Sequence, residues 1–318
     1  MKKSTLIWLI TASCLTAVGV IMMIVVMSIY KWDFTKLSTT EYKSTTYDIT
    51  GEVTDITISA DTEDITFIPC DGENARVECI EPEKINHSVT LDNGKLRIGV
   101  KDDREWYEYI GLFLGNTKIT VYLPAGEYGD LAIKNSTGDM SVPKDYSFKS
   151  IDIKGSTGDL DCSSFVSGPI KVKLSTGDIT IKSISAEKLD LSVSTGTVRV
   201  SGIACEGEIS LDVSTGNADL KNISCRKLNS TGSTGNVYLK NFIATGNIYI
   251  KRSTGGITLN KCDAKSLDLT TSTGDITGSL LSKKVYLTDT SIGRVSVPKT
   301  TEGGKCKVKT STGDIIFR

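Results

Sequence analysis

Short runs in which apolar and polar residues alternate recur at a fixed spacing from about residue 130 to the C-terminus. Each run is centred on a Ser-Thr-Gly motif, as in Ser175-Thr176-Gly177. The apolar positions lie seven and five residues before the glycine and two and four residues after it. This alternation is typical of half-buried strands, so each repeat predicts two short strands that flank a glycine. The ten glycines are Gly138, Gly158, Gly177, Gly196, Gly216, Gly235, Gly255, Gly274, Gly293 and Gly313.

The spacing between these glycines is always 19 or 20 residues. No single repeat can bury its own apolar row, so a period this short predicts one rung of a solenoid that stacks in parallel on the next rung. At about 4.8 Å between rungs, ten rungs would rise roughly 45 to 50 Å. We therefore predict an all-β fold, a single-stranded parallel β-helix. The handedness of parallel crossovers predicts that it is right-handed.

The glycine marks a corner, because the alternation changes phase there. Counted from the strand before the glycine, Thr195 would be the last inward residue and Ser194 would point outward. The next inward residue, Val198, follows Gly196 by two positions, so the chain must turn at the glycine, which accepts a positive φ. In the repeat that ends at Gly293, the apolar residues shift by one position, which predicts a β-bulge.

Residues 1–30 do not belong to the repeats. Lys2 and Lys3 precede Leu6 to Tyr30, a stretch of 25 residues without a charge, which is long enough to span a bilayer. The two lysines predict a cytoplasmic N-terminus and an extracytoplasmic C-terminal part. The alternative is a cleaved signal peptide, but its small-residue cleavage site is missing. A lipoprotein-like cleavage at Cys14 is disfavoured because the apolar run continues for 16 residues beyond it.

Residues 31–45 are predicted to be a short polar tether, residues 46–124 an irregular β cap, and residues 125–318 the regular solenoid. Within the cap, the segment from Asp61 to Phe67 resembles a repeat in which Glu63 replaces the glycine, which predicts a degenerate first rung. The aromatic-rich segment from Arg104 to Phe113 is either a flap over the end of the solenoid, which we favour, or a contact with a partner or membrane.

The charges argue against several functions. The chain has 37 basic and 38 acidic residues, and this net charge of −1 gives no reason to expect binding to nucleic acid. His87 is the only histidine, which leaves little room for histidine-based catalysis or metal binding. The closest candidate for an ion site is a column of outward acids beside a column of lysines. We interpret both as solvated surface columns that neutralise each other: Asp139, Asp159 and Asp178 beside Lys134, Lys154 and Lys173.

The chain has eight cysteines, with Cys14 in the apolar run and seven beyond it. An odd number outside the membrane argues against a complete disulfide framework. Cys162 occupies an inward position and is expected to be a buried thiol. Cys205 and Cys225 fall at equivalent positions of neighbouring rungs, where a disulfide is possible but not implied. The pairing of all seven therefore stays open: Cys70, Cys79, Cys162, Cys205, Cys225, Cys262 and Cys306.

One interior position breaks the apolar pattern. Alternation points Arg252 inward, above Gly232 and near Ser230, where other rungs carry valine or leucine. An unpaired buried guanidinium is costly, so we expect a local bulge that turns Arg252 outward; a polar interior site is the alternative.

The Ser-Thr-Gly-Asp repeats behind a single N-terminal helix resemble the putative-adhesin β-strand-repeat family of bacterial membrane proteins. The resemblance covers residues 46–318 and rests on the recurrence of the motif in register. It implies a right-handed β-helix on the surface of a Gram-positive bacterium, and some relatives accompany envelope-stress systems. It implies no catalytic residue.

The leading hypothesis is a membrane-anchored, non-enzymatic surface scaffold or adhesin with no cofactor, no metal and no catalytic residue. Its partners would be the membrane, through the helix, and an envelope protein or a glycan. The alternatives are a polysaccharide-active β-helix enzyme, which the lack of converging acid and base residues disfavours, and an envelope-stress accessory protein that binds a membrane partner through its cap.

Overall fold

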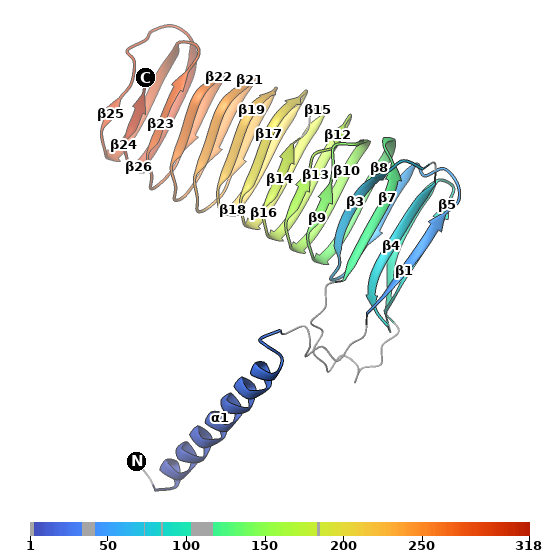
Figure 1. The fold of residues 1–318 in the computed structure, drawn as a ribbon. Coiled ribbons are helices and arrows are strands. Elements are labelled where there is room, and N and C mark those ends of the chain that lie inside the picture. The colour runs from blue at the N-terminus through green and yellow to red at the C-terminus, as the bar shows by residue number, and fades with distance from the viewer. Residues whose placement is uncertain (1–2, 34–41, 73, 84, 103–116, 183–184) are drawn as a thin grey trace.

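The computed structural model describes residues 3–33, 42–72, 74–83, 85–102, 117–182 and 185–318. One helix, α1 (Lys3–Ile29), precedes a body made of strands (Figure 1). The helix is long and apolar enough to cross a membrane. It ends where Lys31 and Trp32 adopt positive φ angles of 54° and 61°, and the Trp32 amide donates to the Met27 carbonyl at 2.8 Å.

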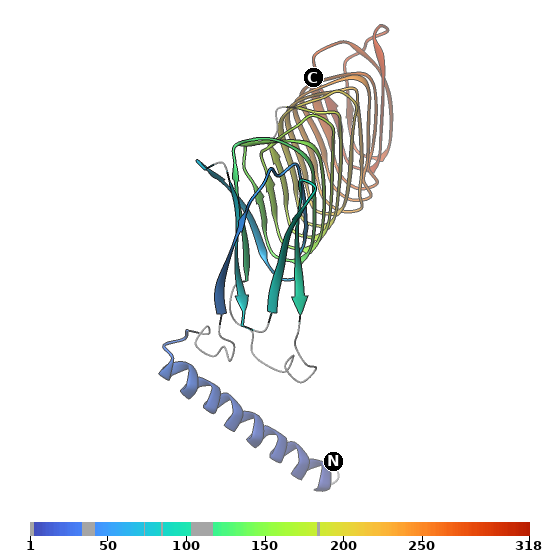
Figure 2. The same cartoon turned by 90° about the vertical axis from the view of Figure 1, so that its right-hand side faces the viewer.

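Each rung of the body contributes one strand before the corner and one after it, so the strands form two walls. Seen along the stack, successive rungs superpose (Figure 2). In spatial order, the first wall contains β5 (Ile85–Asp92), β6 (Lys95–Asp102), β2 (Asp55–Ser59), β8 (Gly126–Thr137), β10 (Tyr146–Thr157), β13 (Pro169–Thr176), β16 (Lys188–Thr195), β18 (Glu208–Thr215), β20 (Lys227–Thr231), the end of β21 (Val237–Lys251), the end of β22 (Ile257–Thr270), β26 (Gly304–Thr312) and β24 (Lys284–Ile292).

The second wall follows the same order of rungs. It contains β1 (Tyr42–Ile49), β4 (Ala75–Pro82), β7 (Lys118–Pro124), β3 (Asp64–Cys70), β9 (Met140–Val142), β11 (Leu160–Cys162), β14 (Ile179–Lys182), β17 (Val198–Cys205), β19 (Ala218–Cys225), the starts of β21 and β22, β23 (Ile276–Leu280), β27 (Ile315–Phe317) and β25 (Val295–Ser296). The short strands β12 (Phe165–Val166) and β15 (Ser185–Ala186) lie in the return segments.

The register of the stack confirms the predicted solenoid. Leu189 of β16 lies beside Ile170 on one neighbouring rung and Ile209 on the other. Equivalent residues therefore form columns, and the inward apolar columns are buried along the whole stack. β1 begins at Tyr42, within the range 31–45 assigned to the tether.

The corner glycine has two reasons to be glycine. Gly196 has a φ of 149°, which side chains rarely adopt, and a Cβ atom there would lie 2.0 Å from the carbonyl oxygen of Gly177 on the preceding rung. All ten motif glycines have positive φ. The corner therefore lets successive backbones approach more closely than any side chain permits.

The prediction that the motif threonine points inward is wrong. Val193 is the last buried residue before the corner, and both Ser194 and Thr195 are exposed. The chain thus leaves the strand alternation one residue earlier than counting predicts. The turn is shared by Ser, Thr and Gly instead of being confined to Gly.

The N-terminal end contains the predicted degenerate rung and then changes direction. β2 and β3 stack in parallel below β8 and β9, and Glu63 stands where the next rung has Gly138, since a Cβ on that glycine would lie 2.3 Å from the Glu63 carbonyl oxygen. Beyond this rung, β1 and β5 pair antiparallel with β4 and β6, which closes the end. The aromatic segment from Arg104 to Phe113 lies outside the described residues.

The last two rungs are stacked in reverse of their chain order. β26 inserts between β22 and β24, so a Cβ on Gly313 would meet the Gly274 carbonyl at 2.1 Å and one on Gly293 would meet the Gly313 carbonyl at 1.9 Å. The rung of Gly293 is therefore the outermost rung (Figure 1).

The predicted β-bulge in this rung is wrong, because β24 and β26 pair without a shift in register. The inward residues of β24 are Lys284, Tyr286, Thr288 and Thr290, and its apolar residue Leu287 faces solvent. Polar inward residues suit the outermost rung, which has a neighbour on one side only. β26 instead buries Cys306 and Val308 between two rungs.

Candidate functional site

The acids that follow the corner glycines form a continuous ladder of hydrogen bonds. Asp159 Oδ1 accepts from the Asp178 amide at 2.7 Å, and Asp139 Oδ1 accepts from the Asp159 amide at 2.8 Å. The ladder starts at Asp64, in the degenerate rung, and ends where Asp178 accepts from the Thr197 amide at 2.7 Å. Each carboxylate thus satisfies a backbone donor of the next rung.

Further along the stack, asparagine side chains accept the same kind of hydrogen bond from the backbone of the next rung. Asn217 Oδ1 accepts from the Asn236 amide at 2.9 Å, and Asn236 Oδ1 accepts from the Gly256 amide at 2.7 Å. The position after the glycine therefore selects a short side chain with an acceptor oxygen. Its charge is not needed for this contact.

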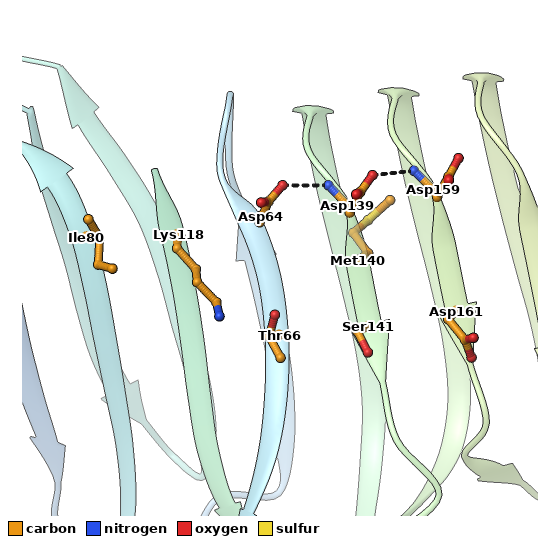
Figure 3. Close-up of a pocket in the computed structure, with 9 residues that line it drawn as sticks. All are labelled: Asp64, Thr66, Ile80, Lys118, Asp139, Met140, Ser141, Asp159 and Asp161. Carbon is orange, nitrogen blue, oxygen red and sulfur yellow. Dashed lines mark hydrogen bonds between the residues drawn. The ribbon is translucent and has the colours of Figure 1, made fainter. Parts of the chain in front are cut away.

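Beside the ladder the second wall is hollowed, with a volume of about 500 Å³ (Figure 3). Four of the residues that line the hollow are aspartates, and Lys118 is the one cation among them. The sticks in Figure 3 show Asp64, Asp139 and Asp159 in a row along the corner, with Asp161 lower on its strand. The lining residues are Asp64, Thr66, Ile80, Lys118, Asp139, Met140, Ser141, Asp159 and Asp161.

The predicted neutralisation between the lysine and aspartate columns does not occur. Lys154 lies 3.4 Å from Asp152 on its own strand, and Asp178 pairs with Arg199 at 2.7 Å. Burial opposes the ionisation of Asp178, but hydrogen bonds from Arg199 and the Thr197 amide outweigh it and lower the pKa of this carboxyl. The like charges in the column are thus offset by backbone amides and one arginine.

The acid column brings carboxylates together without a histidine beside them. Its oxygens Oδ1 are engaged in the ladder, and no histidine lies among the residues that line the hollow. Within the part of the chain that the structure describes, no cluster of three histidine, cysteine, aspartate or glutamate side chains has the geometry to hold a metal ion.

A second polar cluster, buried in the cap, was not apparent in the sequence. His87 Nδ1 lies 2.5 Å from Glu81 Oε2, and its Nε2 lies 3.6 Å from Glu63 Oε1. Glu63 and Glu81 are both almost fully buried, and Glu63 also accepts from the amides of Asp61 and Thr62. The glutamate that replaces the corner glycine therefore folds back into the cap, where it faces His87.

The cluster favours a protonated histidine. Burial alone would lower the pKa of His87, but Cys79, Glu63 and Glu81 around the ring raise the pKa to about 10. Burial would likewise raise the pKa of Glu63, but His87 and the two backbone amides lower it. The imidazolium thus lies between two carboxylates and joins β5 to β4 and to the first corner. Its burial removes it from any reaction at the surface.

Arg252 points into the solenoid, so the expected outward bulge is wrong. Its side chain is 1% exposed, and Nη2 donates to Ser230 Oγ at 3.3 Å. Burial lowers the pKa of this guanidinium to about 10, and Nε and Nη1 have no hydrogen-bond partner among the described residues. The alternative expectation, a polar site in the interior, is therefore confirmed, and this site is closed to solvent.

The cysteines are present as free thiols. Cys162 is buried inside, as the alternation predicts. Cys205 and Cys225 are neighbours across two rungs, since Ala204 and Ser224 are in register. Burial raises the pKa of Cys225 to about 12, with a further contribution from Cys205. Burial raises the pKa of Cys205 as well, which disfavours the reactive thiolate form of both side chains.

Comparison with solved structures gives matches of low identity that span nearly the whole chain. A putative adhesin from Parabacteroides distasonis is 11% identical and has a TM-score of 0.49, with 88% of this chain and 98% of the other covered. A putative adhesin from Bacteroides fragilis is 14% identical and has a TM-score of 0.39, with coverages of 87% and 97%. A protein from Parabacteroides distasonis described as a putative lipid binding protein is 12% identical and has a TM-score of 0.27, with coverages of 87% and 97%.

A search of curated proteins found no match. The family comparison is informative over most of the chain, because the model described as "Toastrack DUF4097" matches residues 53–317. This range contains the cap from β2 onward, the acid ladder and all ten corner glycines. The chain therefore belongs to the Toastrack DUF4097 family.

Proposed function

We propose that this protein is a membrane-anchored, extracytoplasmic scaffold or adhesin without enzymatic activity. The observation that carries the proposal is that the surface acids along the corner are hydrogen-bonded to the backbone. Asp64, Asp139 and Asp159, the acids best placed for catalysis or ion binding, each hold a backbone amide of the next rung. Each of these carboxylates thus has a structural role in the stack, which accounts for its presence without a catalytic one.

The helix supports the anchoring part of the proposal. α1 ends at Ile29 and the first strand begins at Tyr42, so only a short segment separates them. The cap would then lie next to the lipid, and the solenoid would project from it. A long, inert, parallel stack presents a large lateral surface, which suits a role in display or attachment.

Protease accessibility tests the anchoring. Full-length protein with a tag before Met1 would be expressed in bacteria, and protease would be added to intact protoplasts. We expect loss of the solenoid while the tag and helix survive. Protection of the solenoid from the protease would contradict the proposed orientation, and loss of the tag by cleavage after the apolar run would contradict the anchor.

The non-enzymatic part is tested separately. Purified protein would be incubated with pectin, peptidoglycan and teichoic acid, and the products would be analysed by mass spectrometry. Released fragments that disappear in an Asp139→Asn, Asp159→Asn double variant would establish a polysaccharide-active enzyme instead. The same fragments with both proteins would indicate a contaminant.

A further inference from the structure

The outermost rung leaves one side of the solenoid open. β24 pairs with β26 alone and β25 with β27 alone, so no described strand covers their outer edges. We call this rung and the inserted rung next to it, residues 281–318, the distal tip. The distal tip lies at the opposite end of the stack from β1, where the chain enters from the helix (Figure 1).

The distal tip exposes apolar side chains that the rest of the solenoid hides. Ile292 is 68% exposed and Leu281 is 58% exposed, and Leu287 and Val295 are also exposed. Between β1 and β23, the other exposed large apolar side chains among the described residues are Ile80, Tyr238 and Ile243, which are scattered. A concentration of this kind at an open sheet edge is typical of a contact surface.

The distal tip is also basic. Residues 281–318 contain eight lysines and arginines against three acids, whereas residues 42–102 contain thirteen acids against six lysines and arginines. Screening lengths near 10 Å are much shorter than the stack, so each end acts on its own surroundings. The protein therefore has a basic end and an acidic end, although its net charge is only −1.

Several of the cations are free to act on a partner. Lys284, Lys307 and Lys309 are paired with Asp263, Asp268 and Asp289. By contrast, Lys283, Lys299 and Lys305 are exposed, and no carboxylate of the described residues lies within ion-pair distance of them. Three unpaired lysines thus lie on the same two rungs as four exposed apolar side chains.

We propose that the distal tip docks onto anionic lipid headgroups. The lysines would bind the phosphates while Leu287, Ile292 and their neighbours enter the boundary between headgroups and acyl chains. The unpaired backbone groups of β24 limit the depth, since they need the hydrogen-bonding partners of the headgroup layer. The protein would then attach to lipid at both ends, by its helix at one and by this surface at the other.

Two other occupants fit less well. A second copy joined tip to tip would bring two basic ends together, which is unfavourable. A soluble polyanion would account for the lysines but leave the apolar side chains without a partner. The proposal uses the proposed anchor only to fix the opposite end, so failure of one leaves the other intact.

The experiment is a vesicle capture. Full-length protein would be reconstituted in phosphatidylcholine vesicles and mixed with labelled vesicles of either pure phosphatidylcholine or equal parts phosphatidylcholine and phosphatidylglycerol. We expect capture of the anionic vesicles only, with capture falling as salt rises. Since each basic residue near an anionic surface contributes about 1 kcal/mol, changing Lys283, Lys299 and Lys305 to glutamine should weaken capture on the order of 100-fold.

Matched variants separate the explanations. The control for charge changes the mid-solenoid Lys134, Lys154 and Lys173 to glutamine, and should capture like wild type. The apolar test is Leu287→Ser with Ile292→Ser, which should also lose capture, whereas its control, Ile243→Ser with Tyr238→Ser, should not. Thermal melting of each variant checks that it is folded, and wild-type capture that is insensitive to salt would by itself overturn the electrostatic part.

Three results would overturn the proposal. Equal capture of neutral vesicles would remove the role of anionic lipid. Clustering of the protein-bearing vesicles alone would identify a second copy as the occupant. Loss of capture in the lysine variant but not in the Leu287 and Ile292 variant would indicate a surface that reads charge alone, as a soluble polyanion requires.

Discussion

Arg252 occupies the space that Gly232 leaves empty: a Cβ on Gly232 would lie 1.9 Å from Arg252 Nη1. The two residues are at equivalent positions of neighbouring rungs, where earlier rungs carry Leu174, Val193 and Val213. Where other neighbouring rungs place two apolar side chains in contact, these two rungs place a glycine and a guanidinium. The guanidinium has one hydrogen bond, to Ser230.

This arrangement predicts that Arg252→Leu stabilises the protein. Replacing even a buried ion pair by well-packed hydrophobic side chains is often neutral or gains about 1–4 kcal/mol, and this guanidinium has only its hydrogen bond to Ser230 to lose. Urea unfolding of the full-length protein in detergent would measure the gain, with the exposed Arg226→Leu as the control. A loss of stability in Arg252→Leu, with no loss in the control, would mean that the guanidinium has a buried partner such as water or an anion.

The corner predicts an unequal response at three consecutive residues. Gly196→Val should destabilise by about 1–3 kcal/mol or more, because it strains φ and drives Cβ into the carbonyl of Gly177. Ser194→Ala and Thr195→Val should each stay within about 0.5 kcal/mol, because both side chains are exposed. Unfolding curves of the three variants decide this, and a cost for Thr195→Val equal to that of Gly196→Val would contradict the exposed position of the threonine.

From the acid ladder we predict that the stability of the corner depends on the side-chain oxygen that accepts the amide of the next rung and not on the negative charge of the aspartate. Asp159→Asn should be nearly neutral, since Asn217 and Asn236 make the same contact further along the stack. Asp159→Ala should cost about 1 kcal/mol, because the amide of Asp178 loses its acceptor. The comparison is made by thermal melting at constant pH. Equal losses in the two variants would show that the negative charge itself stabilises the corner.

The cap predicts a pH window. The raised pKa of His87 contributes stability that is complete below its ordinary value of 6.5 and is lost as pH rises through about 10. The lowered pKa of Glu63 contributes stability that is present above its ordinary value of 4.5 and is lost as pH falls. Proton NMR can follow this directly, because the chain has one histidine and its ring signal needs no assignment.

Glu81→Gln is the matched test of that window, with the exposed Glu83→Gln as its control. Removing the carboxylate at 2.5 Å should lower the pKa of His87 and reduce the protection of β1 and β5 in hydrogen exchange. A histidine that titrates near 6.5 in the wild-type protein would show that the cap does not hold the ion cluster.

The sequence alone determined the parts of the fold that repeat. The period of 19 or 20 residues, the inward apolar columns, the glycine corner and the degenerate rung at Glu63 follow from local rules, because every rung meets the same requirements of burial and close backbone approach. Parity counting failed at Thr195, where the turn begins earlier than strand alternation predicts.

The contacts between residues that the repeat pattern does not bring together could be seen only in the tertiary structure. The reversal of the last two rungs and the meeting of His87 with Glu63 and Glu81 each join residues that the repeat spacing does not place together, and the position of Arg252 depended on whether the chain bulged there. The distal tip also depends on the tertiary structure: β26, which comes later in the chain, takes the inner place in the stack, so the rung of β24, with Leu287 and Ile292 in outward positions, becomes the open end.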